Sequence, residues 1–450
     1  MKVGKTSSVF IRNSTRFDGN FHLSDGVKAR EIIMKVPYKL YAIGDVTSDV
    51  YCPGIFHRHY VNSGVPFLGG SDILKADYSS GKYLRKETTP NHKILSVNKG
   101  WTLVTCGGTI GETAFVNKDL AKCWLSQHIM RLVPNDRVKE GVLYAYCTSR
   151  YGKLLITTNT YGSIIPTLDS SSIKTIPIPD FPAAFQKQVD DLIQESARLR
   201  EEATEALDKA VLSFDEHIGK SIYESSYQQR KISYEDVLSF NVRFDSQYNI
   251  GTKIIEAEIN NLGVKVVKLS TLLKDIRIGN RSKRLYVDDG IPFLSSSDIL
   301  LANPLRGCKH ISYRTPDLSE MIVKKGTILI SRSGTVGNTV IVGDNLNNVA
   351  ISEHAMKLVT DTSVIEPEYI FAFFNSSLGK KYLQILPYGS VIITLGEEYV
   401  GKMLIPMLDE GIRNSIIQLI KQYTSCCDKS SIIENQAIDL IETEIEKWNK

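Results

Sequence analysis

The chain has 450 residues, of which 42% are hydrophobic and 23% are charged, and its formal net charge is +4. This length and apolar content suffice for two large globular domains with connecting structure. We find no apolar stretch near 18 residues and no charged-then-apolar leader, so we expect a cytoplasmic protein without a membrane partner. Seven cysteines without a C-x-x-C pair fit a reducing compartment and predict neither a disulfide framework nor a zinc site.

Residues 1–182 are predicted to form a first β-rich domain. Short β-prone runs such as Trp101–Thr105 alternate with glycine-rich turns such as Gly107–Gly111. This turn lacks the Gly-Lys-Ser/Thr of a phosphate-binding loop and is not followed by a helical pattern, so it is predicted to connect two strands. The alternative interpretation is a loop whose backbone N–H groups approach a phosphate of nucleic acid. The proline-rich stop Ile176–Pro182 ends the domain.

Residues 183–230 are predicted to form a long helix and a linker. Apolar residues follow alternating steps of four and three, which is the spacing of a coiled-coil seam, with Ser196 as the polar member. The apolar members are Phe185, Val189, Leu192, Leu199, Ala203, Ala206 and Ala210. A helix of roughly 35 to 40 residues would be about 50 to 60 Å long. Ordinary core packing is the alternative interpretation of this stripe.

Residues 231–410 repeat the first domain. Ile291–Leu300 is identical to Val65–Leu74 at seven of ten positions, with an offset of 226 residues. Tyr388–Leu395 matches Tyr161–Leu168 at six of eight positions, with an offset of 227. A repeat this long is a duplicated domain rather than a solenoid unit of about 20 to 50 residues. Two similar bodies with different loops predict two similar tasks on different targets.

Residues 411–450 are predicted to form a second long helix that copies the first. Its seam contains Ile416, Leu419, Tyr423, Cys426, Ile433, Ala437 and Leu440. We therefore expect an α+β fold with two similar β-rich domains, each followed by a long helix. The two helices are predicted to pair as an antiparallel coiled coil with pseudo-two-fold symmetry. Their seams are also the predicted surface for partner proteins.

Motifs of known catalytic chemistry are absent from the sequence. The chain lacks the Asp/Glu-x-Lys ending of metal-dependent nucleases, any Pro-Pro dipeptide of the kind amino-methyltransferases use, H-E-x-x-H and G-x-S-x-G. His128 and His354 recur in the two copies as Ser-Gln-His and Ser-Glu-His, which suggests a base. A lone recurring histidine beside a strand is more typical of a structural residue. We therefore predict no catalytic residue, no metal and no cofactor in this chain.

The charge distribution points to nucleic acid. Both helical segments are net negative, so the rest of the chain carries more positive charge than the overall +4. His57–His59 and Arg277–Arg284 each precede a Pro-Phe-Leu element, yet their sequences differ. Such side chains pair with phosphates and base edges, although a solvated loop is the alternative. The residues predicted to bind DNA are His57, Arg58, His59, Thr105, Tyr161, Ser163, Arg277, Asn280, Arg281, Lys283, Arg284, Arg332, Ser333, Tyr388 and Ser390.

Two expectations within this set are more specific. Arg332 stands in a turn where the first copy has Cys106, so it is a candidate base or phosphate contact that differs between the copies. The cluster from Arg277 to Arg284 is predicted to face mainly phosphates.

The order of these elements resembles the DNA specificity subunit of type I restriction-modification systems. The resemblance rests on Arg16-Phe17-Asp18 and Arg243-Phe244-Asp245, and on the repeated Pro-Phe-Leu-x-x-Ser-Asp-Ile, Gly-Thr-x-Gly and Gly-Ser-x-x-x-x-Leu elements. It implies two target recognition domains that each read one half of an asymmetric bipartite sequence in double-stranded DNA. It also implies that the helices form a spacer and dock two modification (methyltransferase) subunits, which bind S-adenosylmethionine. Restriction (endonuclease/translocase) subunits would add cleavage, and this chain would be non-catalytic.

Two other classes of protein remain open at this point. A free-standing DNA-binding or anti-restriction protein would share the basic loops without needing partner surface on the helices. A carbohydrate-binding or phage adhesion module would be expected to expose aromatic residues rather than Arg, Lys and Asn.

Overall fold

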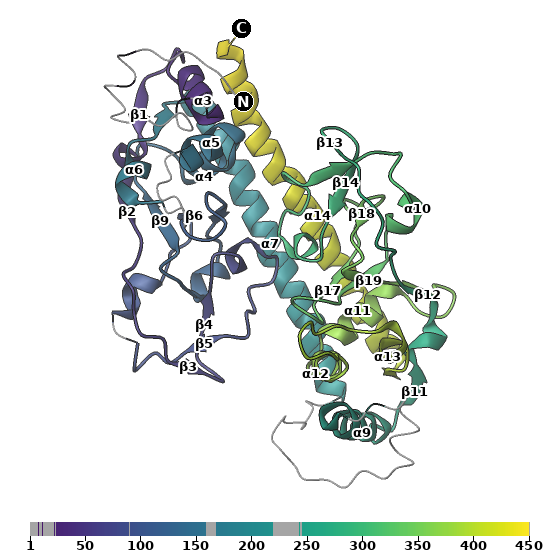
Figure 1. Ribbon diagram of the computed structural model, residues 1–450. Helices are drawn as coiled ribbons and strands as arrows, with labels where there is room; N and C mark the ends of the chain where they lie inside the picture. Colours follow the sequence, from purple (N-terminus) through teal and green to yellow (C-terminus); the bar gives the residue numbers. More distant parts are fainter. Residues whose placement is uncertain are drawn as a thin grey trace. The chain divides into compact units, whose positions relative to one another are not determined.

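The computed structural model describes residues 24–89, 91–158, 168–218, 243 and 245–449, together with Ser8, Ile11 and His22. The chain divides into two compact units. Unit 1 comprises residues 1–201 and 429–450, and unit 2 comprises residues 202–428. Each unit therefore contains one β-rich body and a stretch of both long helices (Figure 1). The predicted elements Arg16–Asp18, Phe244, Tyr161, Ser163 and the linker after residue 218 lie outside the described residues.

Unit 1 consists of short strands, short helices and parts of the long helices. Its strands are β1 (Leu40–Ala42), β2 (Thr47–Tyr51), β3 (Tyr60–Val61), β4 (Val65–Leu68), β5 (Tyr83–Leu84), β6 (Thr102–Thr105), β7 (Thr113–Phe115), β8 (Trp124–Leu125), β9 (Ile129–Pro134) and β10 (Pro177–Pro179). Its helices are α3 (Asp25–Ile33), α4 (Glu140–Thr148), α5 (Arg150–Thr158), α6 (Ser170–Lys174) and the first part of α7 (Ala183–Ile218).

Unit 2 repeats this series. Its strands are β11 (Lys265–Lys268), β12 (Leu273–Ile278), β13 (Tyr286–Val287), β14 (Ile291–Leu294), β15 (Lys309–Ile311), β16 (Ile328–Ser331), β17 (Thr339–Ile341), β18 (Ala350–Ile351), β19 (Ala355–Thr360) and β20 (Leu404–Met407). Its helices are α9 (Ser246–Asn260), α10 (Leu318–Met321), α11 (Pro367–Asn375), α12 (Ser377–Ile385), α13 (Glu397–Gly401) and the first part of α14 (Glu410–Glu446).

The sheets of the two units have the same topology. Unit 1 contains a four-stranded sheet of order β2-β9-β6-β7, a second of order β3-β5-β4-β8, and the pair β1-β10. Unit 2 contains β12-β19-β16-β17, β13-β15-β14-β18 and β11-β20. Even a local irregularity recurs, because the register shifts between Thr47 and Asp49 in β2 and between Leu273 and Asp275 in β12. The predicted duplication is therefore confirmed strand by strand.

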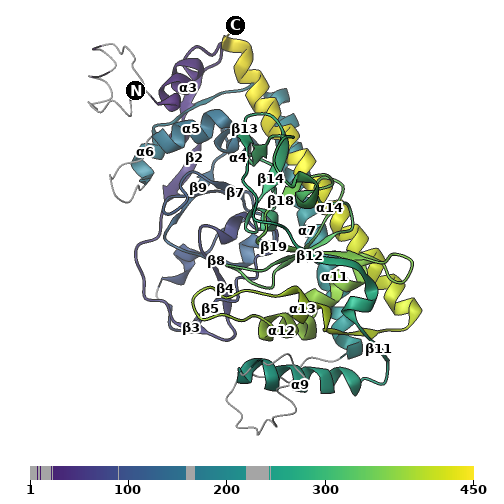
Figure 2. The same ribbon diagram turned by 45° about the vertical axis from the view of Figure 1, so that its right-hand side comes forward.

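The break between the two central helices of each unit follows from two residues. Ser149 ends α4 and its hydroxyl accepts the backbone N–H of Gly152 at 3.2 Å, and Ser376 binds Gly379 in the same way at 3.1 Å. A Cβ on either glycine would lie about 2 Å from a backbone oxygen of the preceding helix. The sequence therefore permits this close approach only with glycine. Helices α3 and α9 then pack beside α5 and α12 respectively (Figures 1 and 2).

In unit 1 the start of α7 lies beside the end of α14, and the two run antiparallel. The Phe181 ring stacks on that of Trp448, with centroids 6.0 Å apart, just before α7 begins and just after α14 ends. Further along α7, Arg200 binds Glu434 of α14 through two hydrogen bonds of 3.0 and 2.8 Å. Residue numbers thus rise from Phe181 into α7 at Arg200, while those of the contacting residues fall from Trp448 to Glu434 of α14. The antiparallel pairing is confirmed within this unit, whereas the pseudo-two-fold symmetry remains a prediction.

Each long helix also packs against the core of its units. The unit 1 core joins Val189 and Ile193 of α7 with Ile438 and Ile441 of α14 and with sheet residues such as Leu132. The unit 2 core likewise contains α7 residues and α14 residues: Ala210, Phe214, Ile218, Ile416, Ile417 and Ile420. No helix in the described part of the chain is long and apolar enough to cross a membrane.

This double packing makes the buried stripe wider than the predicted seam. The seam residues that are buried are Val189, Ser196, Leu199, Ala203, Ala206, Ala210, Ile416, Cys426 and Ala437. The half-buried ones are Phe185, Leu192, Leu419, Tyr423, Ile433 and Leu440. Ile193 and Ile441 are fully buried although the seam omitted them, because they face the β-rich body as well as the opposite helix.

Candidate nucleic-acid interface

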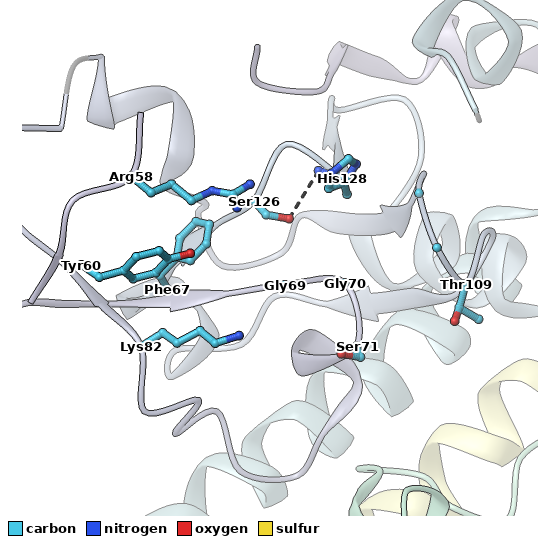
Figure 3. A pocket seen from close by; sticks show the side chains of 12 residues that line it. Arg58, Tyr60, Phe67, Gly69, Gly70, Ser71, Lys82, Thr109, Ser126 and His128 are labelled. Atoms are coloured by element: carbon cyan, nitrogen blue, oxygen red, sulfur yellow. Dashed lines mark hydrogen bonds between the residues drawn. The ribbon is translucent and has the colours of Figure 1, made fainter. Parts of the chain in front are cut away.

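An open pocket of about 370 Å³ lies at one edge of the second sheet of unit 1 (Figure 3). It is called the unit 1 pocket here. Its walls come from β3 and β4, from the start of β5, and from the turns that follow β4, β6 and β8. The lining residues are Arg58, Tyr60, Phe67, Gly69, Gly70, Ser71, Lys82, Gly107, Gly108, Thr109, Ser126 and His128.

Arg58 is fixed in this pocket from two sides. Its guanidinium carbon lies 5.4 Å from the centre of the Phe67 ring and 5.7 Å from that of Phe56, within cation–π range. Its Nη2 donates a hydrogen bond of 2.6 Å to Oε1 of Gln127, and the amide of Gln127 in turn lies 3.2 Å from Nε2 of His128. The neutral amide of Gln127 therefore restrains the orientation of the arginine without adding an opposite charge.

Tyr60 and Lys82 complete the cationic and aromatic wall. The Tyr60 ring meets the Phe67 ring edge-on at 6.3 Å and is 49% exposed. Lys82 is exposed, and Figure 3 shows Arg58 and Lys82 extending on either side of the two rings. An exposed ring between two cations offers a flat apolar surface with positive charge on both sides.

The first loop of the pocket follows β4. Gly69 donates its backbone N–H to the Asp72 carboxylate at 3.0 Å, which closes the turn before the short 3-10 helix Asp72–Leu74. Burial alone would raise the pKa of Asp72, but the Lys75 ammonium at 2.7 Å and the Gly69 N–H lower the pKa below its usual value. Asp72 therefore stays ionised and shapes the loop without facing the pocket.

The second loop is the turn between β6 and β7. The Thr105 hydroxyl binds the Thr109 carbonyl and accepts the Glu112 N–H at 3.0 Å, while Gly108 has a φ of +80° that favours glycine. The prediction that this glycine-rich segment connects two strands is confirmed. Thr105 itself is only 1% exposed, so it acts on this surface by holding the turn.

Unit 2 contains the same arrangement at equivalent positions, called the unit 2 site here. The Arg284 guanidinium lies 5.0 Å from the centre of the Phe293 ring, and Tyr286 meets Phe293 edge-on at 6.2 Å. The Lys309 ammonium lies 5.3 Å from the centre of the Tyr286 ring. Arg284 also forms an ion pair with Glu353.

Strand register shows which residues correspond. Val65 pairs with Leu84 in unit 1, and the equivalent Ile291 pairs with Ile311 in unit 2, so the offset grows by one residue at the next strand. Lys82 therefore corresponds to Lys309. Arg58 corresponds to Arg284, which corrects the expectation that the two basic clusters have unrelated sequences. Both contain Arg-x-Tyr-Val, and both place the arginine over a phenylalanine.

Four positions differ between the matched sites. Gly69-Gly70 is replaced by Ser295-Ser296, Gly107 by Ser333, and Gln127 by Glu353. A Cβ on Gly107 would lie 2.8 Å from Nδ1 of His128, whereas in unit 2 the Ser333 hydroxyl binds Nδ1 of His354 at 2.8 Å. The shared residues thus provide the cations and rings, and the differing residues change the polar groups around them.

Several predicted DNA-binding residues lie at or near these sites. His57, Asn280 and Lys283 are exposed. His59 contacts the Thr88 hydroxyl at 3.0 Å, and Arg281, 83% exposed, lies 3.5 Å from Glu353.

Arg277 corrects the loop prediction for the second basic cluster. It lies within β12, pairs in register with Lys357, and forms an ion pair of 3.0 Å with Asp275. The loop part of the cluster therefore begins only after Ile278, where β12 ends.

Arg332 and the loop from Tyr388 to Leu395 form a separate contact. The Arg332 guanidinium donates to the Thr394 hydroxyl at 3.0 Å, and the Leu395 N–H donates to the Arg332 carbonyl at 3.0 Å. Tyr388 is 42% exposed and Ser390 is exposed. The structure therefore gives Arg332 a role in holding this loop, next to Ser333 of the unit 2 site.

Sequence reasoning missed the residues that surround each arginine. Tyr60, Lys82 and Gln127, and their unit 2 counterparts, come from different strands and turns, so no single motif displays them. His128, which the sequence predicts to be a structural residue, also lines the unit 1 pocket. The available signal was that Ser-Gln-His and Ser-Glu-His recur with a change at the middle residue only.

Comparison with known proteins gives one family match. Residues 38–195 match the type I restriction modification DNA specificity domain. This range includes all the residues of the unit 1 pocket. A comparison with curated proteins gives no match.

Three solved structures align with most of the chain at low identity. The type I restriction-modification system S subunit from M. genitalium has 11% identity and a TM-score of 0.37, covering 92% of this chain and 96% of its own. A structure described as the basis of complex assembly and conformational transition of the type I R-M system has 14% identity and a TM-score of 0.30, covering 92% and 97%. The HsdS subunit from Thermoanaerobacter tengcongensis has 15% identity and a TM-score of 0.28, covering 91% and 96%.

These three likenesses carry no argument, because each has a TM-score of 0.37 or lower. Unit 2 repeats the sheets of unit 1 and its aromatic and cationic site. Residues 38–195 are therefore the part of the chain that is similar to a type I restriction modification DNA specificity domain.

Proposed function

We propose that this chain is the DNA specificity subunit of a type I restriction-modification complex, and that units 1 and 2 each read one half of a bipartite duplex target. The observation that supports this most strongly is the duplicated site. Both units place an arginine over a phenylalanine, an exposed tyrosine at its edge, and a lysine at or just before the start of the neighbouring strand. One of the two sites lies in the family-matched domain.

The chemistry of the site suits double-stranded DNA. Lysine and arginine neutralise phosphates and so provide affinity that falls with salt, whereas a restrained arginine also pairs with the acceptor edge of guanine. An exposed tyrosine contributes apolar contact to bases or sugars. No catalytic step is assigned to these groups.

The differing residues support an asymmetric target. If two identical sites read DNA, the two half-sites would be the same sequence. Here the positions equivalent to Gly69 and Gly70 of unit 1 hold Ser295 and Ser296 in unit 2, and the position equivalent to Gln127 holds Glu353. Because hydrogen-bond donors and acceptors differ at equivalent places, the two half-sites should differ as well.

The long helices fit the role of a spacer and a docking surface. Two modification subunits would bind along them and carry S-adenosylmethionine, restriction subunits would join for cleavage, and the complex would work in the cytoplasm. The arginine-containing loops would then position the DNA for methylation by the partner subunits. This chain would recognise the target sequence and would catalyse no reaction.

The proposal is tested by expressing the chain with the methyltransferase encoded beside it and sequencing the methylated bases of the host. We expect one bipartite motif with unequal halves and copurification of the methyltransferase. Duplex binding by the chain without capture of a methyltransferase would favour a free-standing DNA-binding or anti-restriction protein. No duplex binding at any salt concentration would contradict a DNA-binding function.

A further inference from the structure

The two matched sites hold their arginines with different partners. In unit 1, Arg58 Nη2 donates to the neutral amide of Gln127 at 2.6 Å. In unit 2, Arg284 Nη2 pairs with the Glu353 carboxylate, and that carboxylate is only 8% exposed. Gln127 and Glu353 occupy the same position between the recurring serine and histidine. The sites therefore share a geometry and differ by one charge at the residue that holds the arginine.

The charge has consequences beyond the arginine itself. Glu353 also lies 3.5 Å from Nε of Arg281 and 3.6 Å from Nε2 of His354, so it faces several cationic or titratable groups. In unit 1, Gln127 contacts Arg58 and His128 without adding a charge. A buried carboxylate attracts these cations strongly, because little water screens it. Arg284 is thus largely neutralised, whereas Arg58 is not.

Each arginine keeps one terminal nitrogen for DNA. In the described part of the chain, Nη2 of Arg58 and Nη2 of Arg284 bind the partner residue and both Nε atoms are buried, so Nη1 is the donor that can reach a base or phosphate. An arginine with one edge held and a ring behind it presents its other donors in a fixed direction, which suits an acceptor pair such as guanine O6 and N7. The partner residue decides how much net charge accompanies that contact.

Building on the DNA specificity function proposed above, we propose that Gln127 and Glu353 are specificity-determining residues. Because Glu353 compensates the charge of Arg284, the contribution of Arg284 to DNA binding depends mainly on which base it contacts. Gln127 leaves Arg58 with its full charge, so its contact draws more on phosphate attraction and depends more on salt. One position in the fold thereby sets both the base selectivity and the salt dependence of each half-site. Both residues act through the arginine and are positioning residues.

Reciprocal substitutions test this directly. The full chain, or its complex with the methyltransferase, is titrated with its methylome-defined duplex and with duplexes in which either half is scrambled, from roughly 50 to 200 mM salt. We expect Glu353→Gln to steepen the dependence of log affinity on log salt by about one, because one more cation becomes free to neutralise a phosphate. The loss of affinity over that fourfold range then grows about fourfold.

The selectivity should change in the same half only. Glu353→Gln should bind the duplex scrambled in the unit 2 half-site relatively better, and leave selectivity for the unit 1 half-site unchanged. Gln127→Glu should make the salt dependence shallower by about one and alter selectivity in the unit 1 half-site. Matched controls are Glu410→Gln and Gln188→Glu, which change the same charges at exposed positions of the long helices.

Two further measurements keep the outcomes separate. In an Arg284→Met background the effect of Glu353→Gln on base selectivity should largely disappear, and thermal unfolding shows whether each variant is folded. Failure of the wild-type chain to bind DNA would overturn the proposed function itself. Wild-type binding with a defined motif, together with swaps that behave like the Glu410 and Gln188 controls, would overturn only this inference.

Discussion

Replacing Arg200 by methionine should destabilise unit 1 far more than a typical surface substitution. Arg200 of α7 holds Glu434 of α14 with two hydrogen bonds of 3.0 and 2.8 Å, and Tyr144 donates to the same carboxylate at 2.7 Å. The side chains of Arg200 and Glu434 are only 18% and 4% exposed. Removing the arginine would leave a buried carboxylate without its positively charged partner, and the Tyr144 phenol, which still donates to it, carries no charge.

The expected loss follows from the cost of such a buried charge. Breaking a buried ion pair by removing one partner costs about 3 to 5 kcal/mol, and the partial exposure of Arg200 favours the lower end. Removing all three polar groups should cost much less, because apolar replacement of a buried pair is often neutral. Unit 2 shows the apolar solution, since the positions equivalent to Tyr144, Arg200 and Glu434 hold Phe371, Cys427 and Leu207.

The assay is equilibrium unfolding in denaturant, with hydrogen exchange of α4 and the second half of α14 to locate the effect in unit 1. We expect Arg200→Met to lower the local unfolding free energy by about 3 kcal/mol. The triple variant Arg200→Met, Glu434→Leu, Tyr144→Phe should recover most of that loss. A triple variant no more stable than Arg200→Met would refute the view that the cost is an uncompensated buried charge.

Three further perturbations have defined outcomes. Burial lowers the pKa of Lys357 from its ordinary value of 10.5 to about 8, so the unfolded chain binds more protons than the folded chain between these two pH values. Lys357→Met should therefore raise the free energy of unfolding at pH 7, and this gain should shrink as the pH rises from about 8 to 10.5 in urea titrations. A gain that does not change with pH would show that burial does not penalise the charge of Lys357. Arg281→Ala should weaken binding to every duplex and lower the salt slope by about one, since Arg281 is 83% exposed; an unchanged slope would place it away from DNA. Four residues inserted near Ala203 lengthen one helix by about 6 Å. Methylation mapping should then show a longer gap between the half-sites, or no complex should assemble. An active complex with an unchanged gap would exclude the helix as a spacer.

The fold could be predicted from the sequence because its two main signals are long. Copies separated by 226 and 227 residues fix the duplication whatever the detailed structure, and the long proline-free apolar stripes predict the helices that became α7 and α14. The width of the buried stripe could not be predicted. Ile193 and Ile441 are buried by the β-rich body, and that contact depends on tertiary packing rather than on the helical repeat.

The candidate site was less predictable because strand pairing brings together residues that are far apart in the sequence. Arg58 and Arg284 were identified as candidates from charge alone, but the rings and the partner residues come from other strands. The offset changes by one residue between β4 and β5, which hides the match of Lys82 with Lys309 in a fixed-offset comparison. The connection between the two strands is one residue longer in unit 2 while the pairing is equivalent, so only the strand pairing reveals the match.

The central claim is that each unit reads its own half of the target. The most direct measurement is the methylome of cells that express the methyltransferase with this chain, compared with a chain whose residues 1–182 come from a related specificity subunit. The account predicts that one half of the bipartite motif changes while the other half and the partner methyltransferase remain the same. A motif in which both halves change together, or methylation without a bipartite motif, would contradict it.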